Sequence, residues 1–160
     1  MKKMTLIAGV IGIIAILCIA GYYGLAQQGA GTTQQTKGST SIQHNDTTVF
    51  IPLADLSTTA TFFSYDANGV TIRYFAVKDA QGDAHVALNA CDVCYPEKKG
   101  YTQVGDVMQC LNCGRQFVIT SIGTVNTEGG CWPSYLPITT NGSMATIKIA
   151  DLVNKQYMFA

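Results

Sequence analysis

The feature that most constrains this chain is a repeated cysteine motif in its second half. Cys91 and Cys94 form one C-x2-C pair, Cys110 and Cys113 form another, and fifteen residues separate the two pairs. Two residues between cysteines allow a tight turn to point both sulfurs at one place, and two such turns supply the four thiolates of a tetrahedral metal site. The sequence therefore predicts a ribbon-like double cysteine knuckle with Cys91, Cys94, Cys110 and Cys113 as metal ligands.

The chemistry of four thiolates leaves the identity of the metal open. Tetrahedral thiolate sets bind zinc, a single iron ion or an iron–sulfur cluster. With a divalent ion, four thiolates leave a net charge of about −2, which Lys98, Lys99 and Arg115 lie close enough in the sequence to offset. The same basic residues are equally consistent with ordinary solvated surface.

A pair of disulfides is the main alternative to a metal centre. Disulfides form in oxidising compartments outside the cytoplasm, but five cysteines follow residue 26, so two bridges leave one cysteine unpaired. A thiol–disulfide enzyme of the thioredoxin type is disfavoured, because its C-x2-C motif accompanies a βαβ pattern and the sequence predicts none.

A further cysteine lies in a turn-rich segment. Cys131 stands between Gly130 and Trp132, and three roles stay open for it: another thiolate at the centre, a ligand that exchanges with a neighbour, or a small buried residue. We include Cys131 as an additional candidate ligand. His44 and His85 are isolated in the sequence, and we expect structural roles for them.

The first 26 residues have the composition of a membrane anchor. After Lys2 and Lys3, residues 4–26 carry no charge and are rich in Ile, Leu and Ala. About 20 apolar residues in a helix cross a hydrocarbon core of about 30 Å, and the two lysines place the start of the chain in the cytoplasm. We therefore expect one transmembrane helix within residues 1–26 and the C-terminal domain outside the cytoplasm. A cleaved signal peptide is the alternative.

The rest of the chain divides into a linker and one domain. Residues 27–46 are mostly polar and glycine, cannot repay the entropy of ordering, and predict a flexible linker. Residues 47–160 predict a small, mainly β domain that binds the metal, with hairpin turns at Asn68-Gly69 and Gly105-Asp106. Strands are expected at 47–53, 59–65, 70–78, 84–88, 101–104, 107–109, 117–122 and 144–149, and one short helix at 150–156.

The composition narrows the possible functions. Ten Lys and Arg residues balance ten Asp and Glu residues, so the net charge is zero. A balanced charge argues against a nucleic-acid partner. The sequence shows no paired acid and base, phosphate-binding loop or nucleophile triad, so we expect no enzymatic activity.

A wider pattern joins the cysteine segments to the strands before them, in the stretches Phe63–Asp66, Gly69–Val70, Ile72–Lys78, Ala90–Tyr95, Lys99–Tyr101, Cys110–Gly114, Ile122–Gly123 and Gly129–Cys131. Over about residues 50 to 160, the chain with these stretches resembles the FtrD-like membrane iron–sulfur proteins. The resemblance implies that the two cysteine pairs are the cluster ligands and that Cys131 corresponds to a third cysteine element of the family. This chain departs from some relatives in having one expected span instead of many, and in having Trp132 where a smaller or polar residue is expected.

Members resembling this chain occur in bacterial and archaeal membranes, some beside components of ferrous-iron or copper transport, and are thought to pass electrons. The resemblance therefore implies a membrane-anchored, extracytoplasmic protein whose iron–sulfur cluster or single iron serves electron transfer or metal handling. Its expected partners are the membrane itself and membrane redox or metal-transport components. The alternative is a zinc-ribbon-like interaction module without a redox role, in which the metal contributes only folding energy.

Overall fold

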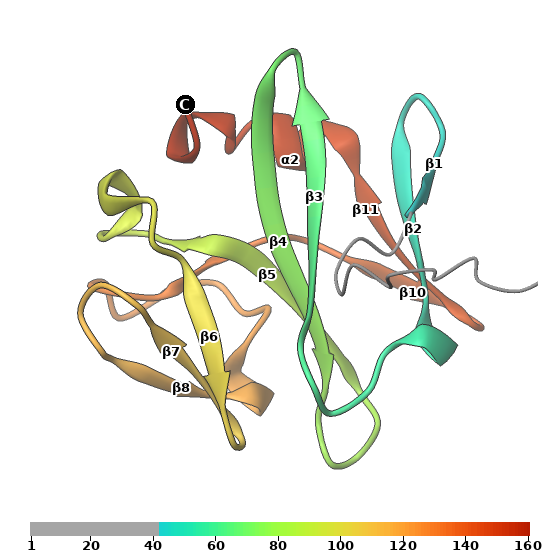
Figure 1. Cartoon of the computed structure of the whole chain (residues 1–160). Helices are drawn as coiled ribbons and strands as arrows, with labels where there is room; N and C mark the ends of the chain where they lie inside the picture. Colours follow the sequence, from blue (N-terminus) through green and yellow to red (C-terminus); the bar gives the residue numbers. More distant parts are fainter. Residues whose placement is uncertain (1–41) are drawn as a thin grey trace, which may run out of the picture. The chain divides into compact units, whose positions relative to one another are not determined.

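The computed structural model describes residues 42–160, which are built almost entirely of β-strands (Figure 1). The expected membrane anchor and most of the expected linker lie outside these residues. Within the described part, no helix is long and apolar enough to span a membrane. The strands are β1 (Gln43–His44), β2 (Thr48–Pro52), β3 (Thr61–Ala67), β4 (Val70–Lys78), β5 (Ala84–Cys91), β6 (Tyr101–Val104), β7 (Val107–Cys110), β8 (Gln116–Val118), β9 (Pro133–Tyr135), β10 (Thr139–Asn141) and β11 (Met144–Lys148).

The strands form three antiparallel sheets. The outer sheet has the order β1-β2-β11-β10, the central sheet β3-β4-β5-β9, and the cysteine sheet β6-β7-β8. Figure 1 shows the cysteine sheet on one side of β4 and β5, and β2 with β11 on the other. The mainly β fold expected from the sequence is confirmed, and β1 lies within the range 27–46 that predicts a linker.

The central sheet carries a hydrophobic core on each face, because successive side chains of a strand point to opposite faces. On β4, Tyr74 and Ala76 pack in the large core against the outer sheet, whereas Phe75 between them packs in the second core against the cysteine sheet. All three side chains are at most 1% exposed. The second core holds Phe75, Ala87, Cys91, Tyr101, Met108, Cys110, Phe117 and Ile122.

Both expected hairpin turns are present. Asn68 and Gly69 have φ angles of 54° and 86°, as a two-residue turn with two positive φ angles requires. The Gly69 amide donates a hydrogen bond to the Asp66 carboxylate at 3.1 Å. Gly105, with a φ of 57°, connects β6 to β7 and brings the two cysteine motifs toward each other.

The end of the domain differs from the sequence prediction at the end of β8, at the short helix, and in β9 and β10, two strands that the sequence does not predict. The strand expected at 117–122 is wrong beyond Val118, because residues 119–121 form the 3-10 turn η3 (Ile119–Ser121). The Ile122 amide donates to the Ile119 carbonyl at 2.9 Å, which closes this turn and ends the strand. The helix expected at 150–156 is the shorter α2 (Ile149–Val153), and the 3-10 turn η4 (Gln156–Met158) follows it.

His85 has a structural position at the edge of the second core. Its Nδ1 atom lies 3.0 Å from the Ile122 carbonyl oxygen, and its Nε2 atom lies 3.0 Å from Oδ2 of Asp79. The other carboxylate oxygen of Asp79 accepts hydrogen bonds from the amides of Gln81 and Asp83 at 2.9 Å each. The hydrogen bond with His85 is the main reason why the pKa of Asp79 is lowered. His85 thus joins the β4–β5 turn to the loop after β8.

Candidate metal centre

The first cysteine pair is placed by the end of β5. Cys91 is the last residue of this strand, is 2% exposed and lies in the second core. The chain then turns, and Cys94 packs against the same core immediately before the 3-10 turn η2 (Tyr95–Glu97). The first C-x2-C motif therefore forms a tight turn directly after a buried strand, as its spacing predicts.

The second cysteine pair is placed by the end of β7. Cys110 pairs with Tyr101 of β6 and is 1% exposed. The Gly114 amide donates to the Cys110 carbonyl at 2.9 Å, and the Cys110 amide donates to the Arg115 carbonyl at 2.9 Å. Gly114 has a φ of 75°, a conformation that glycine adopts at little cost. This turn leaves Cys113 exposed at its tip.

The fifth cysteine arrives through a strand that the sequence does not predict. β9 pairs with β5, with Pro133 opposite Cys91, and the Asp92 amide donates to the Trp132 carbonyl at 3.0 Å. The Trp132 ring packs edge-on against Phe117 with their centroids 5.2 Å apart. These contacts hold Cys131 beside Cys91, and they give Trp132 a packing role.

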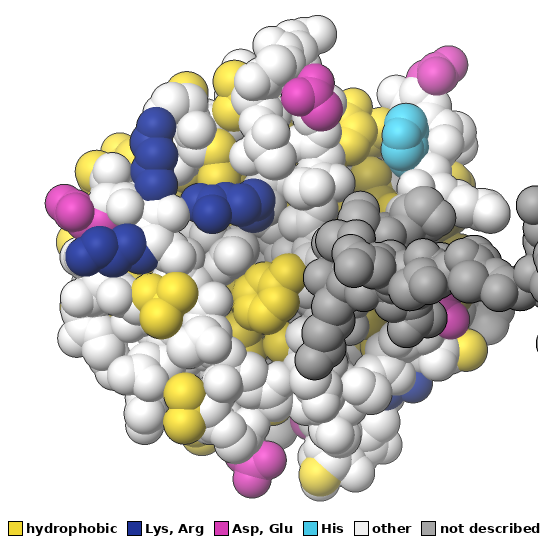
Figure 2. Space-filling view, viewed as in Figure 1, with side chains coloured by type: hydrophobic (Ala, Val, Ile, Leu, Met, Phe, Trp, Pro, Cys, Tyr) yellow, Lys and Arg dark blue, Asp and Glu magenta, His cyan; other side chains and the backbone are white. Residues whose placement is uncertain are grey.

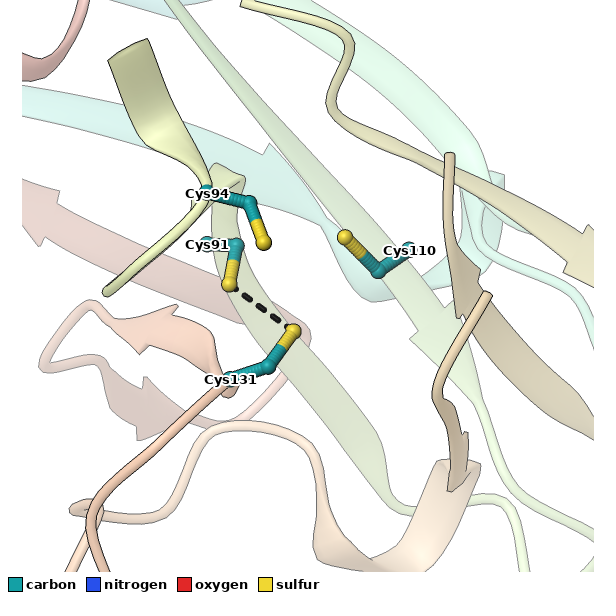
Figure 3. A group of neighbouring side chains, drawn as sticks. All are labelled: Cys91, Cys94, Cys110 and Cys131. Atoms are coloured by element: carbon teal, nitrogen blue, oxygen red, sulfur yellow. Dashed lines mark hydrogen bonds between the residues drawn. The ribbon is translucent and has the colours of Figure 1, made fainter. Parts of the chain in front are cut away.

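The five sulfur atoms converge on one place. The Sγ atoms of Cys91, Cys94, Cys110 and Cys131 all lie within 4.8 Å of one another, and Figure 3 shows these four side chains pointing toward a common centre. The Sγ atoms of Cys91 and Cys131 lie 2.9 Å apart. The Sγ atom of Cys113 lies 3.2 Å from that of Cys131. All candidate ligands named from the sequence are thus brought together, and which of them bind a metal stays a prediction.

The size of this cluster fits one tetrahedral ion. A metal–sulfur bond of about 2.3 Å sets neighbouring sulfurs about 3.8 Å apart in a tetrahedron, and the four mutually close sulfurs lie within 4.8 Å. In a cluster of several irons, bridging sulfides separate the irons, so the cysteine sulfurs lie farther apart than on one ion. The donor set fits iron as well as zinc, because both bind tetrahedral thiolates.

Tyr101 covers the buried side of the cluster. Its hydroxyl oxygen lies 3.8 Å from the Cys131 sulfur, and its ring is 3% exposed. Burial is the main reason why the pKa of Tyr101 is raised, so the group remains a neutral phenol. The Tyr101 amide donates to the Asn89 side-chain oxygen at 2.6 Å. Neither residue was singled out as a site residue from the sequence, because only the pairing of β6 with β7 and the position of Cys131 bring Tyr101 to the sulfurs.

The surroundings act differently on the individual thiols. Burial opposes ionisation of Cys91, but hydrogen bonds with the Cys131 thiol and with the amides of Cys94 and Val93 outweigh it, so its pKa is lowered to about 7. The Arg115 amide is the main cause of the lowered pKa of Cys113. For Cys131, burial first and then the neighbouring Cys91 and Cys113 sulfurs raise the pKa. Burial and these two sulfurs therefore oppose ionisation of Cys131, whereas the pKa values of the two neighbouring thiols are lowered.

The solvent-facing side of the cluster is apolar with a basic margin. Val93 and Leu111, which lie within the two C-x2-C turns, are 59% and 50% exposed. The Lys99 ammonium donates to the Asn112 side-chain oxygen at 3.0 Å, and the Arg115 guanidinium lies over the Phe117 ring. Lys99 and Arg115 thus lie beside the second cysteine turn.

The Lys98 side chain contacts Ala160 instead of the cysteine cluster. Its ammonium donates to the Ala160 carbonyl at 2.5 Å, and its own carbonyl accepts a hydrogen bond from Arg73 at 2.8 Å. Figure 2 shows lysine and arginine side chains gathered over the loop between β5 and β6 and over β4. Of the three basic residues expected to offset the charge of the thiolates, two therefore lie next to the cluster.

Comparison with known protein families gives a match over most of the described residues. The family described as "Membrane iron-sulfur containing protein FtrD-like" matches residues 53–159. Among curated proteins and among solved structures, none matches the chain significantly. The matched range includes all five clustered cysteines and confirms the resemblance seen in the sequence.

Proposed function

This chain belongs to the FtrD-like family of membrane iron–sulfur proteins, and from that membership we propose that it is a membrane-attached carrier of single electrons. The observation that supports the proposal is the convergence of five cysteine sulfurs, with sulfur–sulfur distances as short as 2.9 Å. Thiolate sulfurs are the ligands of protein-bound iron–sulfur centres. We assign the protein electron carriage and no catalytic activity of its own.

We propose a single iron ion as the resident cofactor. Four sulfurs within 4.8 Å of one another suit one tetrahedral ion better than a cluster of several irons. Iron bound in such a site supplies a one-electron couple. Zinc fits the same geometry but has no redox chemistry, so the identity of the metal decides between electron transfer and a purely structural role.

The residues around the cluster support the exchange of electrons at one side only. On the buried side, Tyr101 and the second core exclude water from the sulfurs. On the other side, Val93, Leu111 and Cys113 are exposed, so a partner can approach the thiolates closely there. We propose that this side meets a membrane redox or metal-transport component. We also propose that residues 1–26 attach the domain to the membrane, with the domain outside the cytoplasm.

Metal analysis of the full chain, purified anaerobically in detergent, tests the proposal. We expect about one iron per chain, no acid-labile sulfide, and a visible absorption that bleaches on reduction and returns on reoxidation. Cys110→Ala should lose the iron, whereas the matched control Cys18→Ala, which alters the cysteine of the expected membrane anchor, should keep it. A colourless protein with one zinc per chain would refute the electron carrier, and about two or four irons with labile sulfide would refute the single ion.

A further inference from the structure

A tetrahedral ion uses four of the five clustered thiols, and the structure indicates which one is in excess. We propose that Cys91, Cys94, Cys110 and Cys131 hold the metal, and that Cys113 is a free, solvent-facing thiol which a small disulfide oxidises to a bridge with Cys131. The inference rests on the proposed metal centre. It assigns a ligand set different from the two cysteine pairs and adds an oxidation site to the protein.

The sulfur positions support this ligand set. The four proposed ligands are the ones whose sulfurs all lie within 4.8 Å of one another. Cys91 and Cys110 are buried and Cys94 and Cys131 are half-buried, whereas Cys113 is exposed. Closed sites with four protein ligands are usual for tetrahedral metals that must not be lost.

Exposure also selects the thiol that reacts. The reactivity of a thiol toward a disulfide depends on access as well as on its ionisation. Cys91 lies even closer to Cys131 than Cys113 does, at 2.9 Å against 3.2 Å, but it is only 2% exposed. An external disulfide therefore meets the sulfur of Cys113 first, and the neighbouring sulfur of Cys131 is in place to complete the bridge.

The reaction balances with a low-molecular-weight disulfide as the oxidant. The Cys113 thiolate attacks one sulfur of that disulfide, a mixed disulfide forms, and one small thiolate leaves. The Cys131 sulfur then attacks the Cys113 sulfur, forms the Cys113–Cys131 bond and displaces the second small thiolate. Two protein thiolates lose two electrons and the small disulfide gains them. The sulfurs need to move from 3.2 Å apart to a bond length of about 2.05 Å.

Oxidation of Cys131 removes one of the four ligands. The bridged protein offers only Cys91, Cys94 and Cys110 to the metal, so its affinity falls. The centre therefore keeps its metal where the surrounding small molecules are mainly thiols, and loses the metal where they are mainly disulfides.

The first experiment asks which thiol is free. The full chain in detergent, loaded with the metal with which it purifies or with Zn²⁺, is treated with N-ethylmaleimide, and the modified cysteines are mapped by peptide mass spectrometry. We expect rapid modification at Cys113, protection of Cys131 and no loss of metal. Cys113→Ala should bind about one equivalent of metal, as the control Cys18→Ala does. Protection of Cys113, or loss of metal in Cys113→Ala with an unchanged fold, would overturn the ligand set.

The second experiment adds glutathione disulfide and follows metal release with a chromophoric chelator. We expect release together with a linked peptide that joins Cys113 to Cys131, and at least about tenfold slower release in Cys113→Ala. In Cys131→Ala, we expect a mixed disulfide with glutathione that remains at Cys113. Equal release from the wild type and Cys113→Ala, a Cys91–Cys131 link, or no release would overturn the oxidation step.

These readouts separate the inference from the proposed function. They count metal equivalents and mapped cysteines, and they work with Zn²⁺ as well as with iron. A protein that binds only zinc would refute the electron carrier and still show whether Cys113 is free.

Discussion

The replacement of Gly100 by Ala tests whether a tight backbone approach supports the centre. Gly100 has a φ of 74°, and a Cβ atom there would lie 2.4 Å from the side-chain oxygen of Asn89. That oxygen accepts the hydrogen bond of the Tyr101 amide, and Tyr101 covers the sulfurs. The added methyl group must therefore displace Asn89 and leave the Tyr101 amide without its partner.

The size of the effect follows from two contributions. A side chain in the left-handed region costs about 1 kcal/mol, and a buried amide left without a partner costs about 1–3 kcal/mol. We expect Gly100→Ala to lower the free energy of unfolding by about 3 kcal/mol. At about 4 °C per kcal/mol for a domain of this size, the melting temperature falls by about 12 °C.

The matched control is Gly105→Ala in the neighbouring hairpin. Gly105 also has a positive φ, of 57°, but no atom lies within 4 Å of its Cβ position, so only the backbone cost of about 1 kcal/mol remains. Thermal unfolding followed by circular dichroism measures both variants on the metal-loaded protein. In an Asn89→Ala background, where the obstructing amide is gone, Gly100→Ala should also cost only about 1 kcal/mol. Equal losses for the two glycines, or the same loss with and without Asn89, would refute the reasoning.

Three further perturbations test other parts of the molecule. The hydrogen bond with His85 lowers the pKa of Asp79 from 3.8. The ionised Asp79 carboxylate therefore stabilises the fold above about pH 4, and this contribution is lost as the pH falls below that value. Urea midpoints measured between pH 5 and 2 should fall less in Asp79→Asn than in the wild type. Trp132→Ala removes the ring packed on Phe117 and should lower the free energy of unfolding by about 3 kcal/mol. Cys131 should also be alkylated faster in the metal-free variant than in the metal-free wild type. An unchanged urea midpoint would contradict this prediction. Anaerobic removal of the metal with a strong chelator should lower the melting temperature by more than about 10 °C, and an unchanged temperature would mean that the metal contributes no folding energy.

Local signals in the sequence account for the parts of the fold that depend on near neighbours. The turn at Asn68-Gly69 and the turn at Gly105 were predicted because their residues tolerate positive φ angles. The convergence of the two C-x2-C motifs followed from their spacing and from the β6–β7 hairpin between them. These features involve residues close in sequence, so composition and spacing are sufficient to predict them.

The features that escaped prediction depend on pairing between distant segments. β9 has three residues and begins with Pro133, so nothing in its composition indicates a strand, and only its pairing with β5 brings Cys131 to the centre. The end of β8 after Val118 is local instead, because the chain folds there into η3, where the Ile122 amide donates to the Ile119 carbonyl at 2.9 Å. No glycine or proline within 117–122 marks this end in the sequence.

The pairing of β5 with β9 has a consequence for the order in which the site is completed during protein synthesis. Cys131 follows Cys113 by 18 residues, which at about 5–20 residues per second corresponds to roughly 1–4 s of translation. During this interval the nascent chain carries both C-x2-C motifs without the segment that docks beside Cys91. An ion captured then is held by the two motifs alone, including Cys113. With the proposed ligand set, the mature arrangement requires a handover to Cys131 once β9 has joined the central sheet, so the pairing of β9 with β5 determines the final coordination.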